Sequence, residues 1–141
     1  MSSGRLAAVP LPAPGGLVFD VGASYGPAAG EFSSTWQAHV VVVEANYGFF
    51  NSYLAPAFKG LPEFTLVHAA VSDVDGATMT FYKACNDYLS SARKAWLTDP
   101  AFRFGNHSCF EETKVRAPAC RARKLHRAVD GTRSLLYPRH I

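Results

Sequence analysis

With 141 residues, 48% of them hydrophobic and 18% charged, the chain has the length and composition of a single globular domain, which excludes disordered and fibrous proteins. No stretch approaches the roughly 20 apolar residues that span a bilayer, so we expect a cytoplasmic protein without membrane contacts. The net charge of +3 is unevenly placed, because six Lys and Arg accompany ten Asp and Glu up to Glu112, whereas eight accompany one from Thr113 onward.

The composition divides the chain into three segments. Residues 1–16 are small and Pro-rich, and Pro10, Pro12 and Pro14 interrupt their apolar part, so we expect a flexible lead-in and no secretory signal. Residues 17–130 form the predicted domain, and residues 131–141 form a basic C-terminal tail. The cysteines are odd in number and contain no C-x-x-C pair, so we expect neither a structural zinc site nor a disulfide framework.

The domain opens with an apolar stretch and a glycine turn. Leu17–Val21 holds four apolar residues around Asp20 without alternation, as in a strand that is buried on both faces. Gly22 and Gly26 then bracket a tight turn, where the backbone can fold back and a ligand can approach it. A strand, a glycine turn and a helix in this order are typical of nucleotide-binding folds.

Strands and helices then alternate along the chain. The sequence predicts a helix over 27–37, a strand over 39–44 with four consecutive valines, a helix over 47–58 interrupted near Pro56, and a strand over 64–71. After a turn signal at Asp75 and Gly76 we predict an added strand over 78–82, a short helix over 91–97, and one or two edge strands within 114–125. The predicted fold class is α/β, with a Rossmann-like doubly wound parallel sheet.

In sheets of this type the ligand lies across the carboxyl ends of the strands. Glu44 ends the second predicted strand, where a carboxylate can accept both ribose hydroxyls, although a solvated strand-end acid has the same pattern. Asp73 can accept a hydrogen bond from an adenine amino group or belong to a plain turn. Tyr25 can cover the ligand or only shield the glycine turn.

Asp20 separates two classes of ligand. A pyrophosphate on the glycine turn would lie close to this carboxylate, and like charges repel strongly where the dielectric constant is reduced. S-adenosylmethionine instead carries an ammonium and a sulfonium, together with a ribose and an adenine. Asp20 therefore favours the methyl donor over a nicotinamide or flavin dinucleotide.

Three segments in this order resemble the FkbM-type family of S-adenosylmethionine-dependent methyltransferases: 18–26 (VFDVGASYG), 43–46 (VEAN) and 68–73 (HAAVSD). The resemblance runs from about Leu17 to Tyr82 and implies O-methyl transfer to a small molecule or sugar. It places ribose on Glu44 and adenine near 71–73. The expected cofactor-binding residues are Asp20, Gly22, Ala23, Tyr25, Gly26, Glu44, Ala45, Val71, Ser72 and Asp73, and no metal is expected.

The chain departs from the family pattern after Tyr82. The family continues with a strand of the form val-x-thr-x-x-leu-asp and then a segment like Lys-Ile-Asp-Val-Glu-Gly. Residues 121–128 resemble the first only loosely, and the second is not found before Ile141. We therefore expect a truncated sheet, weak turnover or a partner that completes the acceptor groove, and oligomerisation through the exposed sheet border.

No general base can be named from the sequence. His107 lies in a predicted loop, where a surface role is the usual one, and His68 lies in a strand, where we expect packing. A basic cluster can meet the phosphates of a nucleic acid or form a solvated sheet edge, and its lack of interleaved aromatic residues favours the edge. This cluster comprises Arg121, Arg123, Lys124 and Arg127.

Three functions fit these patterns. The first is a methyltransferase with S-adenosylmethionine as cofactor and a small molecule as acceptor. The second is an NAD-binding Rossmann oxidoreductase, which the glycine spacing and Asp20 disfavour. The third is a non-catalytic remnant that binds a nucleoside or acts through its basic tail. The family segment expected after Asp130, which is not found here, separates the first function from the third.

Overall fold

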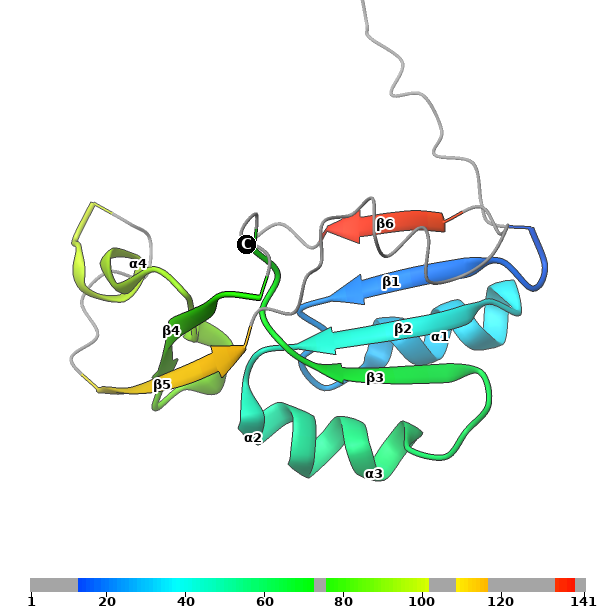
Figure 1. Ribbon diagram of the computed structural model, residues 1–141, viewed down its shortest axis with the longest axis horizontal. Helices are drawn as coiled ribbons and strands as arrows, with labels where there is room; N and C mark the ends of the chain where they lie inside the picture. Colours follow the sequence, from blue (N-terminus) through cyan, green and yellow to red (C-terminus); the bar gives the residue numbers. More distant parts are fainter. Residues whose placement is uncertain (1–12, 73–75, 102–108, 117–133, 139–141) are drawn as a thin grey trace, which may run out of the picture.

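The computed structural model describes residues 13–72, 76–101, 109–116 and 134–138, and its elements form two parts (Figure 1). One part is a parallel sheet with helices, and the other is an antiparallel strand pair. In chain order the elements are β1 (Leu17–Val21), α1 (Pro27–Trp36), β2 (His39–Glu44), α2 (Tyr47–Phe49), η1 (Phe50–Leu54), α3 (Ala55–Phe58), β3 (Phe64–His68), β4 (Thr78–Ala84), η2 (Asp87–Leu89), α4 (Lys94–Thr98), β5 (Phe110–Arg116) and β6 (Ser134–Pro138).

The parallel sheet has the strand order β3-β2-β1-β6. The predicted alternation of strand, helix, strand, helix, strand is confirmed for β1 to β3, so the chain is a mixed α/β protein. β6 lies beside β1, with Leu17 opposite Ser134 (Figure 1). No strand was predicted at 134–138, which was assigned to the C-terminal tail, because a stretch this short gives no local sign of a partner near the start of the domain.

The valine run explains why β2 lies inside the sheet. Alternate side chains of a strand point to opposite faces, and the valines at 40–43 are all buried. Val40 and Val42 join a core cluster with Phe32 of α1 and Leu54 of η1, whereas Val41 and Val43 pack with Phe19 on the other face. The absence of alternation therefore correctly predicts a strand that is covered on both sides.

The helix over 47–58 is continuous through Pro56. A π-helical stretch, η1, precedes the proline, and α3 begins at Ala55 with helical backbone angles. Proline lacks an N–H and crowds the preceding turn, and a locally wider helix accommodates both effects. The predicted interruption near Pro56 is therefore wrong: the helix widens before the proline and does not break.

The second part is a hairpin of β4 and β5. These strands pair antiparallel from Thr78 opposite Arg116 to Ala84 opposite Phe110. The predicted strand over 78–82 is confirmed and extends to Ala84, and the predicted edge strand begins earlier, at Phe110. The short helix predicted over 91–97 is α4, which begins later because Ser91 forms a bridge with Tyr82.

The hairpin packs against the carboxyl end of the parallel sheet. Ala70, just beyond β3, donates its N–H to the carbonyl of Arg116 at 3.2 Å. Ala70 also packs with Phe81 of β4 and Val115 of β5 in a small buried cluster. The hairpin thus stands over the strand ends at which the sequence predicts a ligand. Among the described residues, no helix is long and apolar enough to cross a membrane.

Candidate functional site

A cavity of about 390 Å³ lies at the carboxyl ends of the parallel strands. One side, which we call the sheet wall, comprises Val21, Gly22, Ser24, Val43, Glu44, Ala45, Asn46, Phe49, Ala69, Ala70 and Val71. The other side, which we call the hairpin wall, comprises Phe81, Tyr88, Ser90 and Ala92. This main cavity occupies the position that the fold prediction assigns to a ligand.

The glycine turn connects β1 to α1 through a strained backbone. Gly22 and Gly26 have φ values of +76° and +86°, and Ser24 between them has a φ of +55°. A left-handed conformation is uncommon for a serine and persists only where neighbours hold it. At Gly26 an added Cβ would lie 2.5 Å from the ring of Phe58, whereas at Gly22 it would meet nothing within 4 Å.

The amides of the glycine turn bind within the protein. The N–H groups of Gly22 and Ala23 both donate to the carbonyl of Val43, at 2.9 and 3.2 Å. The N–H of Gly26 donates to the carbonyl of Ala23 at 2.9 Å, and the N–H of Ser24 donates to Oε2 of Glu44 at 2.8 Å. These amides are therefore engaged and do not form an open cradle for a phosphate.

Glu44 links the glycine turn to the end of β2. Its Oε2 accepts from Ser24 and its Oε1 accepts from the N–H of Asn46 at 2.6 Å, while the residue is only 6% exposed. A carboxylate has about four lone-pair positions, so each oxygen keeps acceptor capacity after these bonds. Because Glu44 also lines the main cavity, it can accept hydroxyl hydrogen bonds from a ligand there.

The hydroxyl of Ser24 has no hydrogen-bond partner among the described residues, although its oxygen is buried. Ser24 lines the main cavity next to Glu44. A buried polar group without a partner costs roughly 1 to 3 kcal/mol, and a polar group of a ligand would remove that cost. Ser24 was not among the predicted site residues, although its position between Gly22 and Gly26 was a signal in the sequence.

Asp20 is fully buried and does not line the main cavity. The pleat of β1 places it on the same face as Val18, which packs toward the helices. Any action on a ligand is therefore electrostatic and not a direct contact. At the reduced dielectric of a protein interior such an action extends over several ångströms.

The other predicted cofactor residues divide into two groups. Ala45 and Val71 line the main cavity, as Gly22 and Glu44 do. Ala23 is fully buried, Gly26 abuts Phe58, and neither lines the cavity; nor does Ser72. Asp73, the candidate adenine ligand, lies outside the described residues, as do His107 and the basic cluster at 121–127.

Tyr25 belongs to an aromatic cluster beside the cavity. Its ring lies 4.6 Å from Phe49, 4.4 Å from Tyr53 and 5.0 Å from Tyr88, between ring centroids. Phe49 and Tyr88 line the cavity, but Tyr25 does not. Tyr25 therefore supports the aromatic wall from behind, and the sequence analysis missed both residues that reach the cavity.

Asn46 connects the two walls. Its Oδ1 accepts from the N–H of Gly48 at 2.9 Å and caps α2, and its Nδ2 donates to Oγ of Ser90 at 3.4 Å. Ser90 in turn accepts from the N–H of Ala84 at 3.1 Å. An Asn before a helix is a recognisable cap, but its link to Ser90 depends on the tertiary fold.

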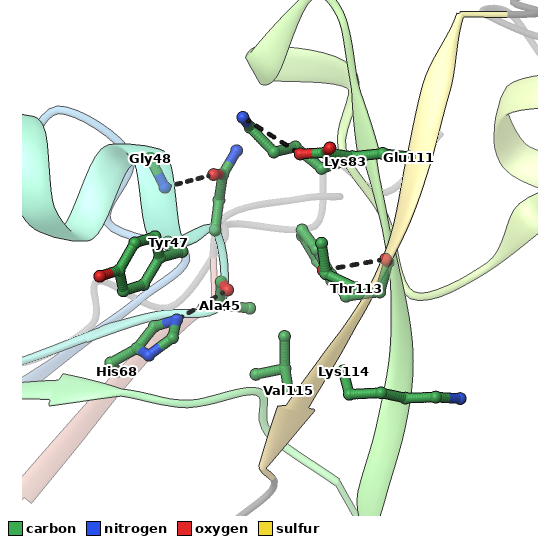
Figure 2. Close-up of a pocket in the computed structure, with 11 residues that line it drawn as sticks. Ala45, Tyr47, Gly48, His68, Lys83, Glu111, Thr113, Lys114 and Val115 are labelled. Carbon is green, nitrogen blue, oxygen red and sulfur yellow. Dashed lines mark hydrogen bonds and ion pairs between the residues drawn. The ribbon is translucent and has the colours of Figure 1, made fainter.

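A second pocket of about 290 Å³ lies between the end of β3 and the hairpin (Figure 2). It shares Ala45, Asn46 and Phe81 with the main cavity, so the two adjoin. His68 bonds the carbonyl of Ala45 at 3.2 Å and stands edge-on to the ring of Tyr47, but the residue is exposed, so the predicted packing inside the strand is not borne out. Lys83 pairs with Glu111 at 3.4 Å at the rim, and the ammonium of Lys114 extends away from the pocket (Figure 2).

Cys85 and Cys109 form a disulfide, so the expectation that disulfides are absent is wrong. The pairing of β4 with β5 explains it. Ala84 lies opposite Phe110, and the next residue outward on each strand is a cysteine, with a Cα–Cα distance of 5.5 Å. Their separation of 24 residues gives no sign of this proximity until the strands are paired.

Within the described part of the chain, no group of three or more His, Cys, Asp or Glu side chains is placed to hold a metal ion. Comparisons with protein-family models, with curated proteins and with solved structures find no match to this chain. The functional inference therefore depends on the geometry of the main cavity and on the sequence resemblance.

Proposed function

We propose that the main cavity binds S-adenosylmethionine and that the chain transfers the methyl group to an oxygen of a small-molecule acceptor. The ribose hydroxyls would donate to Glu44, whose oxygens keep acceptor capacity at the cavity surface. The unpartnered hydroxyl of Ser24 would bind a polar group of the ligand beside the ribose. In this proposal the fold is a Rossmann-like sheet with its ligand at the strand ends.

The observation that carries the proposal is the engagement of the turn amides. A dinucleotide fold binds pyrophosphate with free N–H groups of its glycine turn. Here the N–H groups of Gly22, Ala23 and Ser24 donate to Val43 and Glu44 instead. This arrangement favours a nucleoside without phosphates, which is what S-adenosylmethionine is, over NAD.

The charge and the aromatic lining support the same choice. Glu44 places a carboxylate on the cavity surface at the end of β2, which disfavours an anionic ligand and favours a cation. The rings of Phe49 and Tyr88 line the cavity, and aromatic faces attract cations by roughly 0.5 to 2 kcal/mol. A sulfonium satisfies both conditions, whereas a pyrophosphate satisfies neither.

Methyl transfer is a displacement in line with the sulfonium, so holding the acceptor close to the methyl carbon supplies most of the catalysis. The cofactor supplies an activated methyl group, and no metal is needed for this step. The chain would hold the nucleoside with Glu44 and Ser24 and shield it with Tyr88. As the bond from the acceptor oxygen to the methyl carbon forms, the bond from that carbon to sulfur would break, leaving S-adenosylhomocysteine, and the hydroxyl proton would pass to water.

The test is a calorimetric titration of S-adenosylhomocysteine into three variants. Ser24→Ala should weaken binding about threefold to tenfold, equivalent to roughly 0.7 to 1.4 kcal/mol, without lowering stability, because the hydroxyl has no partner in the free protein. Glu44→Gln should weaken binding more than tenfold. Ser34→Ala, on an exposed turn of α1, is the matched control and should bind as the wild type does.

Unchanged affinity in both cavity variants would remove the main cavity from the binding site. Tight binding of adenosine together with no methyl transfer to any hydroxylated acceptor would favour the non-catalytic nucleoside-binding alternative.

A further inference from the structure

Phe81 of the hairpin wall packs with Ala70 of the sheet wall in a buried cluster. The rest of the hairpin wall, within residues 86–92, has few described contacts with the sheet side: the bond of 3.4 Å from Asn46 to Ser90 and the ring contacts of Tyr88 with Tyr25 and Phe49. Tyr88 is 69% exposed, so these ring contacts bury only part of it. Residues 86–92 are therefore held in place mainly from the hairpin side.

Hydrogen bonds attach Ser90 and Ser91 of the hairpin wall side to β4. The N–H of Tyr82 donates to Ser91 at 2.8 Å, and the N–H of Ser91 donates back to Tyr82 at 3.0 Å. Ser90 also accepts from the N–H of Ala84. Tyr88 lies between this attachment and Cys85, in the stretch where only short-range bonds such as Leu89 to Asn86 are present among those described.

The disulfide lies at the N-terminal end of the same stretch, at Cys85. Cys85 directly follows β4, and the N–H of Cys85 donates to the carbonyl of Cys109 at 3.0 Å. Both cysteines are exposed, so a thiol in solution can reach the sulfur atoms. This bond thus joins the root of the hairpin wall covalently to the start of β5.

We propose that the Cys85–Cys109 disulfide is a redox-sensitive latch that keeps residues 86–92 of the hairpin wall closed over the main cavity. A dithiol reductant would supply two electrons and two protons. The bond between the sulfur atoms breaks, each cysteine becomes a thiol, and the dithiol closes to its own disulfide. The reduced wall opens more often, and ligand affinity falls in proportion to the closed fraction.

This latch rests on the proposed nucleoside site, because the position of the hairpin wall affects the affinity of a ligand only if that ligand binds in the main cavity. It also bears on the compartment. Permanent disulfides are rare in the reducing cytoplasm, where redox-responsive ones are the usual exception. A redox-responsive bond is therefore compatible with the cytoplasmic location expected from the sequence.

The experiment titrates S-adenosylhomocysteine into the full chain, oxidised and after reduction with dithiothreitol. Reduction should weaken binding about tenfold, as expected if the closed fraction falls to roughly one tenth. Cys85→Ser/Cys109→Ser should bind S-adenosylhomocysteine with the affinity of the reduced wild type, and dithiothreitol should not change that affinity. Cys120→Ser, which keeps the disulfide, is the control and should respond as the wild type does.

Hydrogen exchange of the same samples provides a readout without ligand. Reduction should speed exchange of the amides at 86–92 and leave those of β1 and β2 unchanged. Unchanged exchange at 86–92, or equal affinity in both redox states, would overturn the latch. If the oxidised protein binds no S-adenosylhomocysteine, the proposed function fails, and the exchange rates alone then support or overturn the latch.

Discussion

The two walls of the main cavity are held by different kinds of interaction. In the sheet wall, backbone amides of the glycine turn bond to Val43 and to the carboxylate of Glu44. In the hairpin wall, Ser90 and Tyr88 meet the sheet through one long hydrogen bond and ring contacts, and a disulfide lies at the root. The sheet wall should therefore be the more rigid side, whereas residues 86–92 of the hairpin wall should move more readily.

The largest expected effect of a substitution lies in the glycine turn, next to the sheet wall. Gly26→Ala would place a Cβ 2.5 Å from the ring of Phe58 and 2.9 Å from Leu54, at a φ of +86°. Overpacking and left-handed strain together should lower the free energy of unfolding by about 4 kcal/mol. Chemical denaturation monitored by circular dichroism measures this value.

Gly22→Ala is the matched control for Gly26→Ala. It has a similar φ of +76° but no neighbour within 4 Å of the added Cβ. It should cost only about 1 to 2 kcal/mol, the strain alone. Equal losses of unfolding free energy in the two variants would show that packing of the turn against Phe58 does not contribute to stability.

Loss of the disulfide is the next effect in size. The bond closes a loop with a sequence separation of 24, and the chain-entropy relation gives roughly 3 to 4 kcal/mol for such a loop. Cys85→Ser/Cys109→Ser should therefore unfold at a lower denaturant concentration than Cys120→Ser. A loss below about 0.5 kcal/mol would mean that the hairpin does not depend on its covalent closure.

A smaller effect is expected where the two walls meet. Asn46→Ala removes the cap of α2 and should cost about 1 kcal/mol. Ser90→Ala leaves that cap intact and removes the acceptor for Asn46 and for Ala84, so we expect a loss of about 0.5 to 1 kcal/mol. In a double-mutant cycle the coupling should be at most about 0.5 kcal/mol, as suits a bond of 3.4 Å. A coupling above about 1.5 kcal/mol would contradict a loosely attached hairpin wall.

The same contrast between the two walls explains which parts of the cavity could be predicted from the sequence. The sheet wall follows from local signals: the valine run, the glycine turn and the acid at the end of β2 predict β1, β2 and the position of Glu44. The hairpin wall follows from strand pairing between distant segments, which creates both the disulfide and the approach of Ser90 to Asn46. Local patterns therefore predicted Gly22, Glu44, Ala45 and Val71 at the cavity but missed Tyr88, Ser90 and the Cys85–Cys109 bond.

Asp20 illustrates a limit of another kind. The sequence placed it beside the glycine turn, and its burial there agrees with that position. Whether it would touch a ligand depended on the pleat of β1, which turns it toward the helices and away from the cavity. Ser24, two residues after Gly22, lines the cavity instead, from a turn in which its backbone is left-handed.

The most direct test of the central claim is a pair of calorimetric titrations on the oxidised wild-type protein, with S-adenosylhomocysteine and with NAD at the same concentrations. Engaged turn amides and an available Glu44 predict saturable binding of S-adenosylhomocysteine at one site and an affinity for NAD at least a hundredfold weaker. Binding of NAD as tight as that of S-adenosylhomocysteine, or tighter, would contradict the account.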